Sequence, residues 1–167
     1  TTATISWSAG GTWLSGNGGS PAQKLLNTGL WTSSSTPAKV VFTKLPYVTY
    51  DVIVYVGASY DGARGYLRLN NSAATDRFFL ACSGAPQTEF VEPYVTTATR
   101  PWRGNAIRYR NVKGSSLTIA LYRTGYDSVG LHGVQIVESA LDTDKDAMPD
   151  WWEMTHKLSP GVKDGTL

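Results

Sequence analysis

The sequence predicts an all-β fold, an antiparallel β-sandwich of the jelly-roll type that is followed by a short loop and helix at the C-terminal end. Apolar runs of strand length recur along most of the 167 residues, and turn residues separate them. The chain has 17 glycines and 8 prolines, and 11% of its residues are aromatic, which favours short strands joined by turns. No alternation of strands with helices occurs, so we expect no parallel α/β sheet.

The predicted strands follow one another at short intervals. Residues 8–21 are glycine-rich and are expected to form a loop, and residues 23–31 are expected to hold a helical turn. Residues 50–58 are apolar on both faces, which predicts a central strand. The full set of predicted strands is 2–7, 38–45, 50–58, 64–70, 76–81, 88–93, 105–112, 115–123 and 130–138.

Alternation within two of these strands assigns their faces. In 64–70 the leucines alternate with polar or aromatic residues, and in 105–112 Ile107 and Tyr109 alternate with arginines. If the two strands are neighbours, one sheet carries a face that could bind a glycan, since aromatic rings stack on sugars and guanidinium groups bind hydroxyls or carboxylates. An ordinary solvated face is the alternative. The residues of this face are Tyr66, Arg68, Asn70, Arg108 and Arg110.

Charge divides the chain into a basic body and an acidic tail. Residues 1–137 carry twelve basic and six acidic side chains, net +6, whereas residues 138–167 carry three lysines and seven acids, net −4. A basic body could favour anionic partners such as uronic or sulfated sugars or nucleic acid, although surface Lys and Arg also serve solvation alone. Cys82 is the single cysteine, so no internal disulfide is possible, and we expect it to be a small buried hydrophobe.

Residues 142–153, DTDKDAMPDWWE, carry acidic side chains at positions 1, 3, 5, 9 and 12 of a twelve-residue run. This is the ligand spacing of an EF-hand calcium loop, in which a hard cation takes about six to eight oxygens and the carbonyl at position 7 supplies one. Position 6, glycine in that pattern, is Ala147, which needs positive φ or a different bend. The predicted calcium ligands are Asp142, Asp144, Asp146, Met148 through its carbonyl, Asp150 and Glu153.

The same run also fits an acidic helix start, with Asp150 as the N-terminal anion. The helix that follows carries Trp151 and Trp152, and at most one of them can face the sandwich squarely. We expect this pair to dock the tail on the body. The stretch is then a clamp and joint rather than an active site.

Residues 27–70, together with KGSSLTIALYRTG at 113–125 and VGLHGVQIVE at 129–138, resemble the galactose-binding-like β-sandwich modules of secreted bacterial polysaccharide-degrading enzymes and surface proteins. The layout resembles carbohydrate-binding families 6 and 35, whose last strand returns to the core beside the first. The tail is similar to the calcium-binding repeats of thrombospondin type 3 or dockerin-like character. The resemblance implies a glycan-binding module at 1–139, and a calcium loop, short helix and start of a linker at 140–167.

The resemblance implies non-catalytic binding of a plant or algal polysaccharide, with acidic glycans as one option, either at rim loops or on a concave sheet face. Trp102 is the first choice for a ligand contact because it stands in a polar loop where no strand alternation buries it. Trp7, Trp13 and Trp31 are expected in the core, and His132 is expected to be structural. The candidate ligand-binding residues are Trp102, Arg103, Arg100, Tyr60, Asp61, Arg64, Tyr66, Arg68, Arg108, Arg110 and Tyr126.

Three other functions compete with this prediction. A glycosidase needs two facing carboxylates, but Glu89 and Glu92 point to opposite faces of a predicted strand, so we expect no enzyme activity. Arginines and aromatics interleave at 99–113 as in single-strand nucleic-acid binders, yet the acidic tail argues against that partner. A structural or adhesion spacer with a calcium-stiffened joint and no glycan binding stays open.

No run of apolar residues is long enough to span a membrane, so no membrane partner is expected. The chain begins at Thr1 without a signal peptide, which suggests a segment of a longer secreted polypeptide. The resemblance implies an extracellular or cell-surface module attached to a catalytic domain, and we expect it to be a monomer.

Overall fold

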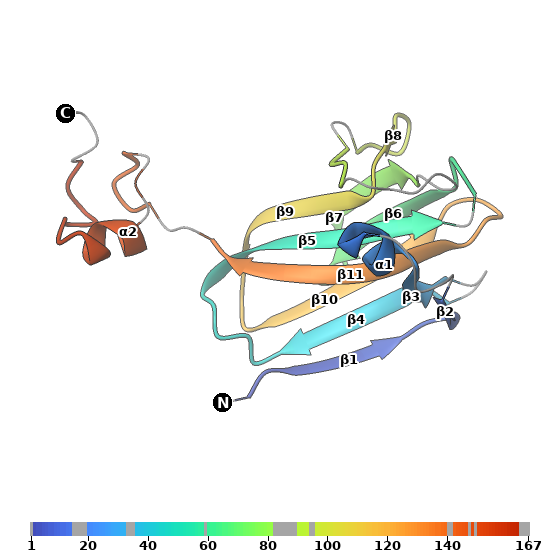
Figure 1. The fold of residues 1–167 in the computed structure, drawn as a ribbon, viewed down its shortest axis with the longest axis horizontal. Coiled ribbons are helices and arrows are strands. Elements are labelled where there is room, and N and C mark those ends of the chain that lie inside the picture. The colour runs from blue at the N-terminus through green and yellow to red at the C-terminus, as the bar shows by residue number, and fades with distance from the viewer. Residues whose placement is uncertain are drawn as a thin grey trace.

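The computed structural model describes residues 2–14, 20–32, 36–58, 60–81, 90–93, 96–139, 142–146, 148 and 150–163. Two sheets form a β-sandwich, as predicted (Figure 1). The six-stranded sheet has the order β1 (Thr4–Ser8), β4 (Ala38–Thr43), β10 (Ser116–Arg123), β6 (Arg64–Leu69), β7 (Ser72–Leu80) and β8 (Trp102–Arg103). The five-stranded sheet has the order β2 (Gly11–Leu14), β3 (Thr28–Trp31), β11 (Val129–Glu138), β5 (Thr49–Ala58) and β9 (Ala106–Lys113).

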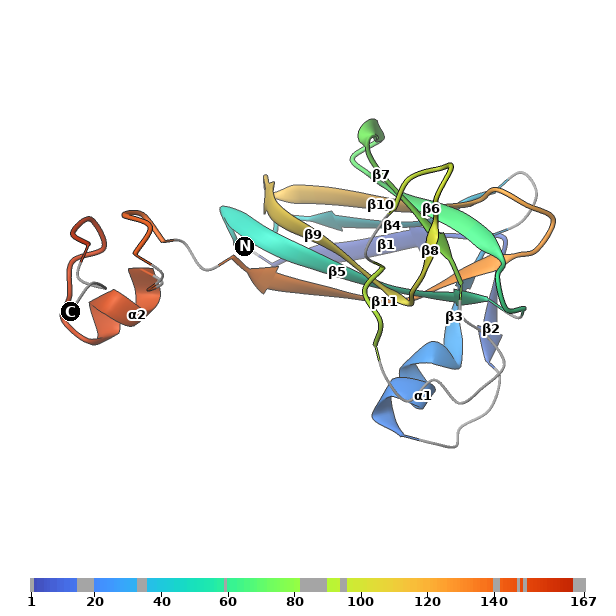
Figure 2. The ribbon, with the colours of Figure 1, turned by 90° about the horizontal axis from the view of Figure 1, so that it is seen from above.

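Strand pairs are antiparallel, as expected, with the exception of a short parallel pair between β7 and β8. β5 pairs with β11 on one side and β9 on the other, so the prediction of a central strand at 50–58 is confirmed. The helical turn predicted within 23–31 is present as helix α1 (Pro21–Leu26). This helix lies on the outer side of the five-stranded sheet (Figure 2).

Two short strands were not predicted. β2 lies inside the segment that we expected to be a loop, and β3 follows α1 where only a helical turn was expected. Each is four residues long and contains one glycine, so local strand propensity is weak and the partner strand decides the conformation. The strand predicted at 88–93 is absent at residues 90–93, and its other residues lie outside the described part of the chain.

The resemblance placed the last strand beside the first, and that expectation is wrong for this chain. β11 lies between β3 and β5, whereas β1 pairs with β4 in the other sheet. The polar face proposed from strands 64–70 and 105–112 does not form either, because β6 belongs to the six-stranded sheet and β9 to the five-stranded sheet. Alternation assigned the faces of each strand correctly but contained no information on which strands are neighbours.

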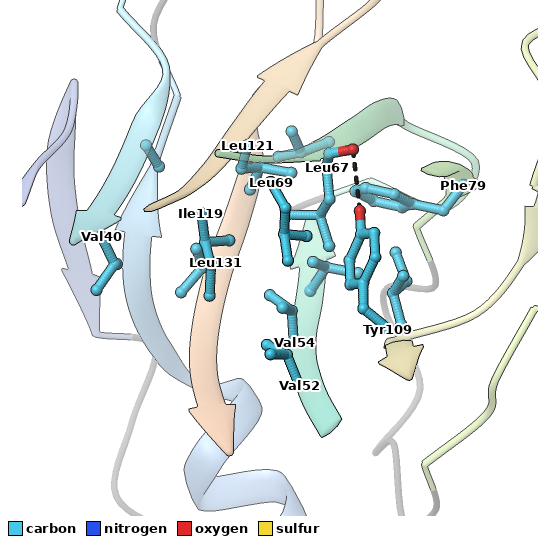
Figure 3. Packing of buried hydrophobic residues seen from close by; sticks show 14 of the residues in the cluster. Val40, Val52, Val54, Leu67, Leu69, Phe79, Tyr109, Ile119, Leu121 and Leu131 are labelled. Atoms are coloured by element: carbon cyan, nitrogen blue, oxygen red, sulfur yellow. Dashed lines mark hydrogen bonds between the residues drawn. The ribbon is translucent and has the colours of Figure 1, made fainter. Parts of the chain in front are cut away.

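The core lies between the sheets and is built from alternate residues of the internal strands. Val52, Val54 and Val56 of β5 are fully buried and face the other sheet. The hydroxyl of Tyr109 donates a hydrogen bond of 3.1 Å to the carbonyl of Leu67, which joins β9 to β6 across the core (Figure 3). This pairing satisfies a polar group that burial would otherwise leave without a partner.

The expectation that Trp7 is buried is wrong. Trp7 lies opposite Val40 and therefore on the core side of its sheet, but it is 60% exposed, and Ile5 beside it is 65% exposed. β1 is the edge strand of the six-stranded sheet, so its inward side is left partly open to solvent. The position of Trp7 on an edge strand, rather than the apolar character of its side chain, decides how exposed it is.

The described tail contains a loop and helix α2 (Asp150–Thr155), which lie beyond the end of β11 in Figures 1 and 2. The prediction that Trp151 or Trp152 docks on the sandwich concerns side chains outside those described. Among the described helices none has the length and apolar character needed to cross a membrane.

Candidate functional site

The loop between β5 and β6 meets strand β8, and an ion pair between Asp61 and Arg103 joins them. In the paired strands Arg64 lies opposite Leu80, and Leu80 lies opposite Arg103. Directly paired residues point to the same face of a sheet, so the two arginines share one face. Trp102 lies opposite the buried Phe79 and therefore points to the other face of this edge strand. We give the name rim cluster to Tyr60, Asp61, Arg64, Arg100, Trp102 and Arg103.

The aromatic members of the rim cluster are open to solvent, because Tyr60 is 67% and Trp102 45% exposed. Residues 96–101 turn back on themselves, with a bridge from Thr96 to Pro101 and a hydrogen bond from the Arg100 amide to the Thr97 carbonyl. A hollow of about 270 Å³ lies beside this turn. It is lined by Arg64, Gly65, Phe78, Phe79, Ala98, Pro101 and Thr124.

Tyr126 lies in the loop between β10 and β11 and is 98% exposed. Its carbonyl accepts a hydrogen bond from Arg123, which supports the loop backbone. The same loop begins next to the rim cluster, since the Thr124 amide donates to the Arg64 carbonyl at 2.9 Å. Tyr126 is therefore an exposed ring on a neighbouring loop.

The outer face of the six-stranded sheet carries two of the predicted residues, Tyr66 and Arg68. The Tyr66 and Tyr122 rings stack with centroids 4.8 Å apart and planes 9° apart, and Phe78 packs against Tyr66 with centroids 5.0 Å apart. Arg68 binds Asp76 through two hydrogen bonds of 2.8 Å. Because these side chains bind one another, the ring faces of Tyr66 are turned toward protein neighbours.

The two remaining predicted arginines lie on β9. Arg108 faces a groove of about 500 Å³ on the outer side of the five-stranded sheet, with its Nε 3.8 Å from Glu92. Phe90 covers part of this groove and packs on Tyr55, with ring centroids 4.5 Å apart. Arg110 is exposed and lies where the β5–β9 register shifts, so it is displaced from the regular alternation.

The five-stranded sheet carries a second hollow that the sequence did not indicate. It measures about 260 Å³ and lies where β2, β3 and β11 approach the end of β5. Trp13 and Trp31 line it, although both were expected in the core, and both are partly exposed. We call this the tryptophan hollow; its other lining residues are Ala58, Ser128, Val129 and Gly130.

Two buried polar atoms lie next to the tryptophan hollow. Trp13 Nε1 and His132 Nε2 have no hydrogen-bond partner among the described residues, and the two rings lie with centroids 5.4 Å apart. His132 Nδ1 lies 2.6 Å from the carbonyl of Thr28, and since a carbonyl only accepts, this nitrogen carries the proton. His132 Nε2 is therefore an acceptor, and burial lowers the pKa of His132 to about 4.

The carboxylates of the sandwich within the described residues are held separately. Asp51 accepts hydrogen bonds from the Asn111 amide and the Ser139 hydroxyl, both at 3.0 Å. Asp61 and Asp76 pair with different arginines on different parts of the molecule. This arrangement orients Asp51, Asp61 and Asp76 individually. Glu92 lines the same groove as Asp51 and lies 3.8 Å from Arg108 Nε.

The acidic loop brings together three of its predicted ligands. One carboxylate oxygen from each of Asp142, Asp144 and Asp146 lies within 4.8 Å of the others. Asp150 and Glu153 are outside this group, and both Asp150 oxygens accept hydrogen bonds from Thr143.

Several backbone groups shape this loop. Asp142 accepts bonds from the Lys145 and Asp146 amides, and Asp146 accepts one from the Met148 amide at 2.8 Å. Lys145 adopts a positive φ of 63°, whereas Ala147, where the turn was expected, lies outside the described residues. Burial and the neighbouring carboxylate of Asp146 raise the pKa of Asp144.

No protein-family profile matches the chain, and a search of curated proteins found no significant match. Among solved structures the chain is similar to TmCBM61 in complex with β-1,4-galactotriose, with a TM-score of 0.42 and 12% sequence identity. The alignment covers 82% of this chain and 88% of that chain. Because the similarity is this low, we argue from the side chains of this chain alone.

Proposed function

We propose that the sandwich is a non-catalytic carbohydrate-binding module and that the rim cluster is its main glycan-binding site. The observation that carries the proposal is the exposed Trp102 indole on the edge strand β8, next to Arg103, which pairs with Asp61 of the loop that also carries the exposed Tyr60. An exposed aromatic ring stacks on the apolar face of a sugar, and guanidinium groups bind its hydroxyls or carboxylates.

The charge of the rim cluster favours acidic glycans. The rim cluster contains three arginines, Arg64, Arg100 and Arg103, and a single carboxylate, Asp61, which pairs with Arg103. A net positive surface attracts uronic or sulfated sugars, and the paired Arg103 is already oriented for a planar anionic group. A plant or algal polysaccharide with carboxylate or sulfate groups is the ligand class that this chemistry fits.

A binding role without catalysis is supported by the arrangement of the acidic groups. Glycoside hydrolysis by two carboxylates needs them about 5 to 10 Å apart across a sugar. Here Asp51 is tied to Asn111 and Ser139. Glu92, on the same groove, lies beside Arg108, and Asp61 is tied to Arg103. We place the module in a longer secreted bacterial polypeptide, attached to a catalytic domain and acting outside the cell as a monomer.

Calcium in the acidic loop is part of the proposal. The carboxylate oxygens of Asp144 are buried beside those of Asp142 and Asp146, which fits groups that share a cation. Asp142 and Asp146 would supply further oxygens, and the fully buried Glu153 and Asp150 come from the helix that follows. Bound calcium would neutralise this cluster and stiffen the joint after β11.

Glycan binding is tested by affinity gels and calorimetry on polygalacturonate, alginate, a sulfated galactan, xylan and mixed-linkage glucan. Trp102→Ala should weaken binding by about tenfold, since stacking on an aromatic ring contributes about 1 kcal/mol or more. Trp7→Ala is the matched control, because Trp7 is an exposed indole on the edge strand β1. If no polysaccharide retains the protein, the proposal of glycan binding is refuted and a structural spacer is favoured.

A further inference from the structure

Glycines of neighbouring strands leave room for the rings around the tryptophan hollow, and one of them, Gly130, lines it. Gly11, Gly130 and Gly57 lie on the same face of the sheet. In the paired strands Gly11 is opposite Trp31, Trp31 is opposite Gly130, and Gly130 is opposite Gly57. A Cβ atom on Gly11 would lie 2.2 Å from the Trp31 indole nitrogen, and one on Gly57 would lie 2.6 Å from His132 Nε2. Larger residues at these positions would displace the aromatic rings, so the glycines create the space that the rings occupy.

A register shift in β11 places the side chain of His132 against these glycines. The β5–β11 pairing skips from Leu131 to Gly133, so His132 is the bulged residue. A bulge redirects its side chain out of the regular alternation. His132 is 8% exposed, and its Nε2 would lie 3.2 Å from a Cβ on Gly130, which lines the hollow.

The two polar atoms beside the hollow have opposite hydrogen-bonding roles. Trp13 Nε1 is a donor, and His132 Nε2 is an acceptor because Nδ1 holds the ring proton against the Thr28 carbonyl. A buried donor or acceptor without a partner costs about 1 to 3 kcal/mol. Both atoms are covered in this structure, so a ligand reaches them only after a movement of the Trp13 ring; a hydroxyl group placed there can accept from the indole and donate to the imidazole at once.

Charge is absent from the described lining of the hollow. The lining consists of two indoles, Ser128 and small or aliphatic residues. A carboxylate or sulfate placed there would lose its hydration without gaining an opposite charge. An uncharged ligand with ring faces and hydroxyl groups fits this surface.

We propose that the tryptophan hollow is a second glycan subsite, on the other sheet from the rim cluster, that binds a neutral pyranose ring. The Trp13 and Trp31 indoles stack against the sugar, and one sugar hydroxyl accepts from Trp13 Nε1–H and donates to His132 Nε2. The proposal deepens the proposed function, since it adds a site of different charge selectivity. It uses none of the residues of the rim cluster.

Nuclear magnetic resonance of the six tryptophan indole N–H groups tests this subsite on the whole chain. Each signal is assigned by a Trp→Phe substitution, and the probes are cellotriose, xylotriose, mannotriose and β-1,4-galactotriose, all neutral. We expect at least one probe to shift the Trp13 and Trp31 signals and to slow hydrogen exchange at Trp13 Nε1. The Trp7 signal should stay in place.

Trp31→Ala should weaken binding of the same neutral probe by about tenfold, and Trp7→Ala should leave it within about twofold of the parent. Binding should also be nearly independent of salt, because no charged group contributes. If no neutral trisaccharide moves the Trp13 signal, or if Trp31→Ala binds as well as the parent, the subsite is refuted. Titration of Trp102→Ala with polygalacturonate reports on the rim cluster alone, so failure of either site is seen separately.

Discussion

His132 Nδ1 donates a hydrogen bond of 2.6 Å to the carbonyl of Thr28, which ties β11 to the start of β3 across 104 residues of sequence. The bond fixes the tautomer of the imidazole and leaves Nε2 as an acceptor. Burial outweighs this bond and lowers the pKa of His132 from 6.5 to about 4. The ring is therefore neutral in the folded protein at neutral pH.

Folding stability should fall as the pH drops from about 6.5 to about 4, because His132 binds a proton in the unfolded chain before it does so in the folded protein. The loss attributable to this group is on the order of 3 kcal/mol. Urea unfolding at a series of pH values measures it. His132→Gln should flatten the decline across that interval, and an unchanged pH profile in this variant would contradict the assignment.

Tyr109→Phe should lower the free energy of unfolding by about 1 to 2 kcal/mol. The change removes the hydroxyl that binds the Leu67 carbonyl and leaves that buried acceptor without its partner. Tyr55→Phe is the matched control, since the Tyr55 hydroxyl binds Gln135 at an exposed position and its loss should cost less than about 0.5 kcal/mol. Equal losses of unfolding free energy in the two variants would show that the hydrogen bond across the core stabilises the fold no more than the exposed one does.

Arg68→Ala should lower the melting temperature while leaving glycan affinity within about twofold of the parent. The Arg68 guanidinium is held by Asp76 through two bonds and lies over the Tyr66 and Tyr122 rings, so its contacts are internal. Asp61→Ala breaks the more exposed pair with Arg103 and should change the melting temperature less. Loss of glycan binding in Arg68→Ala would make the outer face of the six-stranded sheet a candidate glycan-binding site again.

Binding of an acidic polysaccharide should weaken by about tenfold when salt is raised from about 0.05 M to about 1 M, because salt screens exposed charges. Arg64→Gln should reduce both the affinity and its salt dependence, since Arg64 is an exposed cation of the rim cluster. Calorimetry on polygalacturonate at several salt concentrations measures both. Salt-independent binding would remove the acidic-glycan part of the proposal.

Calcium should raise the melting temperature of the tail, and a chelator should increase hydrogen exchange at residues 142–158. A ligand at about 100 times its dissociation constant stabilises the folded state by about 2.7 kcal/mol. Asp144→Asn should remove most of the effect, because Asp144 is one of the three clustered carboxylates. Asp127→Asn, an exposed acid outside the tail, is the control. Identical melting with calcium and with chelator would count against the site.

The long apolar strands were predictable, because the order of apolar and polar side chains within each segment fits a strand and assigns its faces. Residues 50–58 alternate fully buried valines with outward residues, and residues 64–69 and 106–113 keep the predicted faces. β2 and β3 were missed because four-residue strands have little signal of their own. The tryptophan hollow was missed because Trp13 lies in a segment predicted to be a loop and because only the pairing of β2, β3 and β11 brings its lining together.

The sequence by itself determined the fold class, the faces of the long strands and the clustering of Asp142, Asp144 and Asp146, because these depend on periodicity and spacing over a few residues. Only the tertiary structure decided which strands are neighbours. That choice put Arg68 and Arg108 on opposite sheets, left Trp7 on an open edge, and brought Trp13 beside His132. Such pairings join residues far apart in the chain, and strand registry and packing set them rather than any local pattern.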